Sequence, residues 1–64
     1  MNTRQIAHRK LNQAIAHLEN LDKCVFEVGT VYDDLHKEVS TPLFLLIEMS
    51  DEIKKVINKV KEKI

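Results

Sequence analysis

The chain has 64 residues, of which 44% are hydrophobic and 31% charged, and its formal net charge is zero. A chain of this length forms at most one domain, and its core rarely supplies more than about 3–5 kcal/mol without disulfides, a metal or oligomerisation. The single cysteine, Cys24, excludes an internal disulfide and, without further ligands, a structural zinc site. We therefore expect oligomerisation to support the fold.

The single glycine and single proline leave no room for a multi-stranded sheet. The longest apolar run, 43–47, is far shorter than the roughly 20 residues that span a bilayer, so no membrane association is expected. The N-terminal residues show no apolar signal core. A free thiol without an export signal favours the cytoplasm.

An apolar stripe predicts that the first part of the chain is one long helix. Its members recur at alternating steps of four and three residues, which only a helix places on one side. They are Ala7, Leu11, Ala14, Leu18, Leu21, Val25, Val28, Tyr32, Leu35 and Val39. With Thr3 as its N-cap, the helix is expected to continue to about Val39.

Gly29 is the position where this helix could break. Gly29 and Thr30 could form a C-cap followed by a new N-cap, which would give a three-helix bundle. A short β-hairpin there is disfavoured, because an isolated hairpin is marginal in water. Since the stripe keeps its phase across Gly29, we expect one helix, bent near this residue.

Ser40, Thr41 and Pro42 are predicted to separate the two helices. A residue before proline is disfavoured in the α region, and proline suits the first helical position. A second stripe follows, formed by Leu43, Leu46, Ser50, Ile53, Ile57, Val60 and Ile64. The prediction is a hairpin whose arms are roughly 36 and 22 residues long, or about 54 and 33 Å, with about a dozen N-terminal residues overhanging.

Residues 43–47 are apolar around the whole helix. They are expected to lie inside a multi-helix core, with a docking surface for another protein as the alternative. In that alternative, Leu43, Phe44 and Ile47 are the candidate partner-binding residues.

Few residues could carry chemistry. His17 and Cys24 are about 10 Å apart along a helix, too far for a thiolate–imidazole pair, and we expect Cys24 to be a small buried side chain. Asp33 and His36 have the spacing of a helical metal pair, but both lie off the apolar stripe, and no second copy of the pair or inward-facing glutamate accompanies them. Phosphate-binding glycine loops and nucleophile motifs are missing from the sequence. We predict no enzyme activity, no cofactor and no metal.

Charge is distributed in three blocks. Residues 1–18 contain three cations and no acid, residues 19–52 contain nine acids and two lysines, and residues 53–64 contain five lysines and one acid. A hairpin would bring both basic blocks to the end opposite the turn. Compensation of the helix dipole accounts for the C-terminal lysines but not for Arg4, Arg9 and Lys10. These three are candidate contacts for a nucleic-acid backbone or another anion.

The sequence thus predicts an all-α helical hairpin that assembles as an antiparallel dimeric four-helix bundle. A lone hairpin would leave half of each stripe in water, and opposed turns would place basic ends against acidic regions. The predicted interface residues are Leu11, Leu18, Leu21, Val25, Leu46, Ile53 and Ile57. The expected function is a non-enzymatic module that self-associates and binds or inhibits a larger protein. The alternative is binding of RNA or DNA backbones without sequence specificity.

Overall fold

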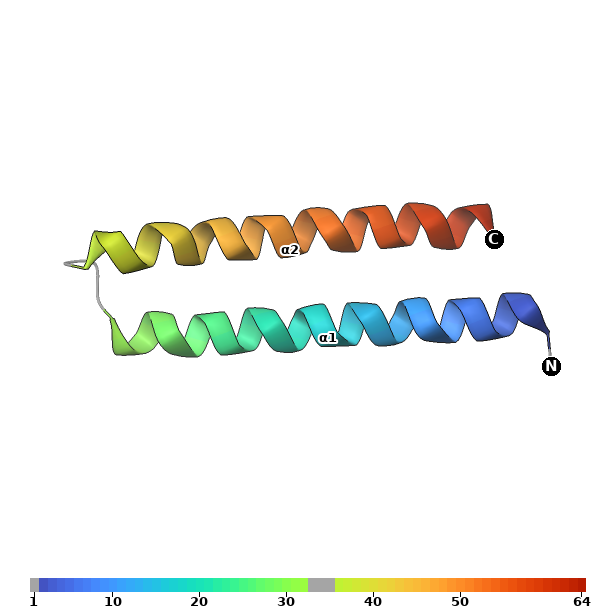
Figure 1. Ribbon diagram of the computed structural model, residues 1–64, viewed down its shortest axis with the longest axis horizontal. Coiled ribbons are helices and arrows are strands. Elements are labelled where there is room, and N and C mark those ends of the chain that lie inside the picture. The colour runs from blue at the N-terminus through green and yellow to red at the C-terminus, as the bar shows by residue number, and fades with distance from the viewer. Residues whose placement is uncertain (1, 33–35) are drawn as a thin grey trace.

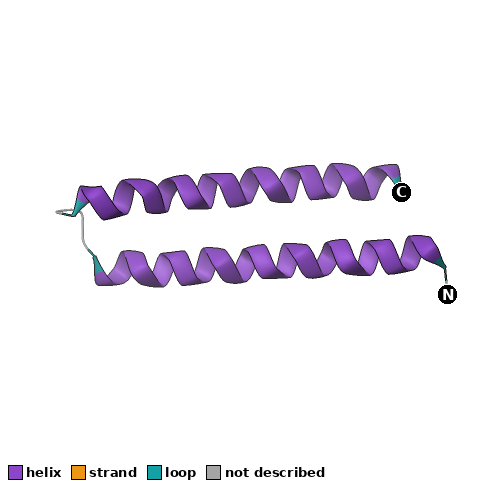
Figure 2. Cartoon of the chain, in the orientation of Figure 1, coloured by secondary structure: helices purple, strands orange, loops and turns teal. Residues whose placement is uncertain are grey.

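The fold is an antiparallel pair of helices, seen in a computed structural model that describes residues 2–32 and 36–64. Helix α1 spans Thr3–Val31 and helix α2 spans Lys37–Lys63. The two helices lie side by side along their whole length, and both termini are at the same end (Figure 1). Within the described residues the remaining positions are short loops or termini (Figure 2). The prediction of an all-helical hairpin is confirmed.

Helix α1 begins one residue earlier than predicted. Asn2 is the N-cap, and its side-chain Oδ1 accepts a hydrogen bond of 2.9 Å from the backbone N–H of Arg4. This bond satisfies one of the free N–H groups of the first turn. Thr3, predicted as the cap, is therefore the first helical residue.

Helix α1 passes through Gly29 without a break and ends at Val31, so the prediction that it reaches Val39 is wrong. Its last turn combines glycine with β-branched residues, which have low helix propensity. Thr30 Oγ1 also donates to the Glu27 carbonyl over 2.7 Å. Tyr32 then takes an extended conformation with φ −105° and ψ 126°. The first apolar stripe therefore continues past the end of α1, and its last member, Val39, belongs to α2.

Helix α2 begins at Lys37, so the boundary predicted at Ser40, Thr41 and Pro42 is also wrong. The backbone N–H groups of Val39 and Ser40 donate to the His36 carbonyl over 2.9 and 3.0 Å. Pro42 lies inside the helix and has no N–H to offer the carbonyl four residues earlier. The missing hydrogen bond lies next to the first turn of the helix, whose N–H groups have no intrahelical partners in any case.

The two helices have 29 and 27 residues, so the predicted overhang and the three-helix alternative are both wrong. Nearly equal lengths let the helices pack from end to end. The connection lies between Tyr32 and His36, whose rings meet edge to face at a centroid distance of 5.6 Å. The intervening positions, including the stripe residue Leu35, lie outside the described residues.

The helices contact each other along a narrow seam. Leu11, Leu18 and Val25 of α1 are half-buried there, as are Ile47 and Ile57 of α2. No apolar side chain among the described residues is fully buried. The Cα radius of gyration is 15.2 Å, whereas a compact domain of this length has about 11 Å. The hairpin is therefore a thin rod without a closed core.

Candidate functional site

Part of each apolar stripe lies at the surface of the hairpin. Leu11, Leu18 and Val25 face the other helix, whereas Leu21 and Val28 are 40% and 42% exposed. The same division occurs in α2, where the members of the second stripe at positions 46, 53, 60 and 64 are exposed. Three of the nine described members of the first stripe and four of the seven members of the second are exposed, so the hairpin leaves part of each stripe in water.

The exposed helical members of both stripes lie on one face of the hairpin. In α1, Leu21 and Val28 each follow an inward residue by three positions, and Leu46 and Ile53 do the same in α2. Three residues rotate a side chain about the helix axis by the same angle and in the same sense. Because the helices are antiparallel, that rotation leads to the same side of the pair.

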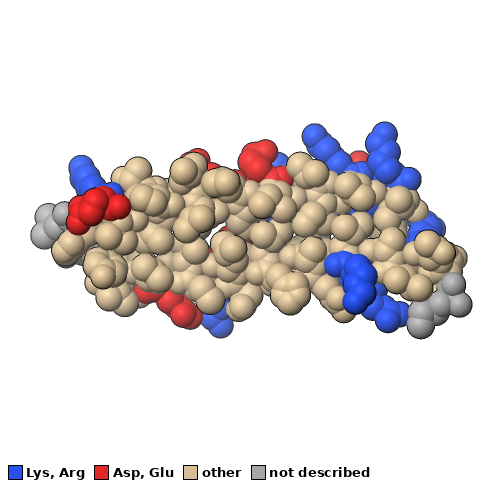
Figure 3. Space-filling view, in the orientation of Figure 1, with Lys and Arg blue, Asp and Glu red and all other residues tan. Residues whose placement is uncertain are grey.

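We call this surface the apolar face and define it by Leu21, Val28, Leu46, Ile53, Val60 and Ile64. Figure 3 shows a broad face over both helices where uncharged side chains predominate and charged ones lie at the margins. A shallow hollow on it is bordered by Leu11 and Ile53 from the two helices. Met49 and Val56, more than half exposed, extend the surface on α2.

Charged residues dominate the opposite face of the hairpin. Glu48 and Asp51 follow Phe44 by four and seven residues, so they share its side of α2. Glu19 precedes Phe26 by seven residues and shares its side of α1. Phe26 and Phe44 are 69% and 70% exposed on this otherwise polar surface.

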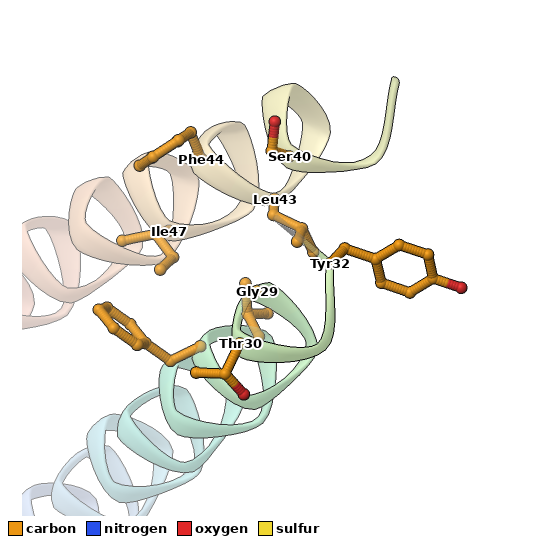
Figure 4. Close-up of a pocket in the computed structure, with 9 residues that line it drawn as sticks. Gly29, Thr30, Tyr32, Ser40, Leu43, Phe44 and Ile47 are labelled. Atoms are coloured by element: carbon orange, nitrogen blue, oxygen red, sulfur yellow. The ribbon is translucent and has the colours of Figure 1, made fainter. Parts of the chain in front are cut away.

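A small pocket lies between the helices near the turn. Its volume is about 200 Å³, and Phe26 and Phe44 stand on opposite helices around it. Leu43 and Ile47 point toward α1, and the backbone of Gly29 lies across from them (Figure 4). The ring of Tyr32 points away from the pocket. The site therefore has an apolar floor and two aromatic walls.

A polar layer interrupts the seam near the middle of the hairpin. Lys54 Nζ of α2 donates to Asp22 Oδ2 of α1 over 2.8 Å, and both side chains are 23% exposed. Lys54 also contacts Asp51 Oδ1 at 3.3 Å. Ser50 is 2% exposed, and neither its Oγ nor Asp22 Oδ1 has a hydrogen-bond partner of normal geometry among the described residues.

This layer shifts the pKa values of both charged groups. The hydrogen bond from Lys54 is the main cause that holds the pKa of Asp22 below its usual 3.8. The nearby Ser50 hydroxyl lowers that pKa further, and burial opposes both effects. In turn, Asp22 raises the pKa of Lys54 above its usual 10.5, with a smaller contribution from Asp51. The charged forms thus stabilise each other.

The hairpin gathers cations at its open end, as the charge blocks predicted. Figure 3 shows lysine and arginine side chains concentrated near the two termini. Arg9 and Lys10 are exposed. Arg4 is also exposed, and its Nε donates to the carbonyl of Ile64. Lys61 is drawn inward, where its Nζ donates to Asn12 Oδ1 over 2.6 Å.

The residues predicted for an oligomer interface fall into two groups. Leu11, Leu18, Val25 and Ile57 are half-buried between α1 and α2 of the same chain. The others, Leu21, Leu46 and Ile53, lie on the apolar face. Their role in assembly stays a prediction. Of the predicted partner-binding residues, Leu43 and Ile47 are half-buried, Phe44 is exposed, and all three line the pocket.

Several other predictions concern single residues. Cys24 is exposed, so its predicted burial is wrong, because it precedes the inward Val25 by one position and is turned away from α2. The Asp33 and His36 pair lies partly outside the described residues. Among those described, no three metal-ligating side chains come together. Neither described helix has the length and apolarity needed to cross a membrane.

Sequence periodicity placed Ser50 on the second stripe, but it did not identify the ion pair beside it or the role of Phe26. Lys54 occupies a seam position that an apolar pattern treats as surface, and its partner Asp22 lies 32 residues away. An ion pair across helices leaves no local signal in the sequence. Phe26 is marked only by a weak local signal, since it is a large aromatic residue outside the stripe.

The fold and these surfaces define the molecule as a small α-helical hairpin with one uncovered apolar face. No protein-family model, curated protein or solved structure matches this chain. The case for its function therefore comes from its own surfaces.

Proposed function

We propose that this protein is a non-enzymatic interaction module that self-associates and binds or inhibits a larger protein. The observation that carries the proposal is the uncovered apolar face on a hairpin whose described apolar side chains are nowhere fully buried. Contiguous exposed apolar surfaces of this kind mark sites of protein association. A core of this size rarely supplies more than about 3–5 kcal/mol without a further support such as oligomerisation.

The size of the exposed surface fits a dimer. The chain exposes 5298 Å². A compact monomer of 7.4 kDa exposes about 4,200 Å² by the usual scaling of surface with mass. The excess, about 1,100 Å², is close to the roughly 800 Å² that each partner contributes to a standard interface. A second copy packing its own apolar face on this one would form a four-helix bundle.

Charge favours one arrangement of the two hairpins. With the turns at opposite ends, the basic open end of each copy lies beside the acidic, turn-proximal part of the other. With the turns together, like charges would oppose each other at both ends of the bundle. Single exposed pairs contribute only about 0–1 kcal/mol, but fields of like sign can decide between otherwise similar packings.

Sedimentation equilibrium at micromolar concentration tests the dimer. We expect a mass of twice 7.4 kDa that falls on dilution. A well-folded monomer whose mass does not change with concentration would contradict the proposal.

The exposed thiol of Cys24 can report the orientation. Cys24 lies about seven residues from the middle of α1, so opposed turns separate the two thiols by about 20 Å along the bundle. Pyrene attached to Cys24 should then show monomer emission. Strong excimer emission would place the turns at the same end.

The cations at the open end support a second candidate function, the binding of RNA or DNA backbones. Arg9 and Lys10 are exposed there. Arg4, close to them in α1, donates a hydrogen bond to Ile64 at the end of α2. Such binding should weaken steeply between about 50 and 200 mM salt. Replacing Arg4, Arg9 and Lys10 with glutamine should abolish a gel shift with duplex DNA or RNA. The absence of any complex of the wild-type protein at low salt would exclude this function.

A further inference from the structure

We propose that two copies of the chain pair α2 against α2 in antiparallel orientation, with Glu38 of each copy forming an ion pair with Lys63 of the other. The inference rests on the proposed self-association and specifies which helices meet and which charges set their register. It comes from a row of exposed residues on α2, which we call the flanking stripe and define by Glu38, Leu45, Met49, Val56 and Lys63.

The flanking stripe runs along one side of α2 from its first turn to its last. Its later members follow Glu38 by 7, 11, 18 and 25 residues, which is close to two, three, five and seven helical turns. Leu45, Met49 and Val56 are 55%, 53% and 57% exposed, and the charged residues at both ends are exposed as well. Met49 follows Leu46 of the apolar face by three residues, so the flanking stripe borders that face.

The order of its residues makes the flanking stripe complementary to itself. Glu38 and Lys63 lie 12 and 13 residues on either side of Ser50, the midpoint of α2. Two α2 helices that overlap fully in antiparallel orientation therefore bring Glu38 of each copy level with Lys63 of the other. In the same register, Leu45 is level with Val56 of the second copy. One two-fold axis thus matches both the charged and the apolar members.

The same pairing follows from the stacked hairpins of the proposed bundle. When the apolar faces meet and the turns lie at opposite ends, the two-fold axis runs across both helices, so each helix lies on its own counterpart. The flanking stripe then borders the contact between the two α2 helices. With the turns at the same end, α2 would lie on α1, and Glu38 would be about 38 Å along the bundle from Lys63 of the second copy.

The helix dipole alone does not account for these charges. A dipole favours acids in the first turn and bases in the last turn on every side of a helix. Lys37 and Glu62 lie in the same two turns as Glu38 and Lys63, but on the side of Phe44, and their signs are reversed. The acid-to-base order thus occurs on the side of α2 that a second copy would contact.

Neighbouring charges leave the two end residues available for each other. Among the described residues, neither Glu38 nor Lys63 forms an ion pair within the chain. Glu52 and Lys59 are rotated from the flanking stripe by about 40° and 60° around the helix axis. Glu52 already contacts Lys55 at 3.1 Å, and Lys59 is level with an uncharged position of the second copy.

Charge reversal followed by mixing tests the inference. Glu38→Lys and Lys63→Glu each place like charges at both ends of the α2 pair. Each variant alone should therefore dissociate with a constant about tenfold above that of the wild-type dimer in about 50 mM salt. In an equimolar mixture, a dimer of one variant with the other has opposite charges at both ends. Its dissociation constant should lie within about threefold of the wild-type value.

The comparison of each variant with the mixture isolates the contact between copies. Every chain carries one substitution in either kind of dimer, so effects on helix stability cancel. Circular dichroism checks that both variants keep the wild-type helix content. Salt of about 1 M should remove most of the gain on mixing, because it screens exposed charges.

Lys37→Glu and Glu62→Lys are the matched control pair. They change the net charge by the same amounts and in the same turns of α2, but on the side of Phe44. Their mixture should associate no more tightly than the two variants do alone. An equal gain on mixing for both pairs of variants would overturn the inference, because net charge would then explain it.

Sedimentation equilibrium of the wild-type protein beside these variants separates the inference from the dimer itself. If the wild-type protein dimerises but Glu38→Lys and Lys63→Glu gain nothing on mixing, the pairing of α2 with α2 is wrong and the dimer stands. If the wild-type protein is a monomer at every concentration, the dimer and the inference both fail.

Discussion

Lys54 Nζ of α2 lies 2.8 Å from Asp22 Oδ2 of α1, and this ion pair joins the two helices across their seam. The residues are 32 positions apart in sequence, so the contact exists only when the helices adopt this register. Ser50, the one buried residue among those described, lies beside it. An ion pair between two fixed positions restricts the register more than apolar contacts do. We therefore interpret the polar layer as the feature that selects the register.

The pair should make stability depend on pH. The pKa of Asp22 is lowered in the folded chain, so unfolding takes up protons in acid, and this contribution is lost as pH falls below about 3.8. The pKa of Lys54 is raised, so its contribution is lost as pH rises beyond about 10.5. Asp22→Asn should lower the free energy of unfolding near pH 7. When this free energy is measured by urea denaturation at several pH values, its decrease in acid should be smaller for the variant than for the wild-type protein, which defines the acid limb of the curve. Glu19→Gln, at an exposed site, should leave that limb unchanged.

Replacing Ser50 with alanine should stabilise the hairpin by about 1 kcal/mol. The buried Oγ has no hydrogen-bond partner of normal geometry, and leaving such a group unsatisfied costs about 1–3 kcal/mol. The same variant should raise the pKa of Asp22, because the nearby hydroxyl lowers it, and this effect should make the gain in stability smaller at neutral pH than in acid. Denaturant titration and carboxyl chemical shifts measure the two effects. A loss of more than about 1 kcal/mol would mean that Ser50 makes a stabilising hydrogen bond.

Pro42→Ala should stabilise the chain by about 1–3 kcal/mol. Proline in a helix interior is about 3 kcal/mol less favourable than alanine, and Pro42 is the sixth residue of α2, just past its first turn. If the helix instead began at Pro42, the substitution would bring little gain, because proline suits the first helical position. Thermal denaturation measures the change, and amide exchange of residues 39–41 reports the helix start directly.

Gly29→Ala should stabilise α1 by about 0.5–1 kcal/mol. Alanine restricts the unfolded backbone, and its methyl group meets no atom within 4 Å. The control is Ala16→Gly, an exposed position in the same helix, which should lose a similar amount. Denaturant titration compares the two. A destabilised Gly29→Ala would show that the methyl group disturbs packing at this position.

Ile53→Glu should raise the dissociation constant of the proposed dimer more than tenfold. Ile53 is 47% exposed in the single chain, and the dimer would bury it on the apolar face. A carboxylate there would have no partner in an apolar interface, where an uncompensated charge costs several kcal/mol. Thr30→Glu introduces the same charge at an exposed residue outside the apolar face and should leave the dimer intact. Equal dissociation constants for both variants in sedimentation equilibrium would exclude the apolar face as the interface.

Apolar periodicity was sufficient to predict two antiparallel helices and the exposure of part of each stripe. These features follow from local geometry, because 3.6 residues per turn put every third or fourth side chain on one side. The gathering of Arg9 and Lys10 with the C-terminal lysines followed from the hairpin and the charge blocks alone. The phase of the stripe also predicted that the helix continues through Gly29, as it does, although a glycine by itself is compatible with a helix interior and with a helix end.

The position of the turn was decided by the packing of the two helices. Local signals at Thr41 and Pro42 favoured a helix start there, but that boundary would leave about a dozen N-terminal residues without a helix to pack on. Starting α2 at Lys37 costs one hydrogen bond near its first turn and gives helices of 29 and 27 residues. Packing also placed Lys54 at the seam, because its ammonium group can pair with Asp22 only when the two helices adopt this register.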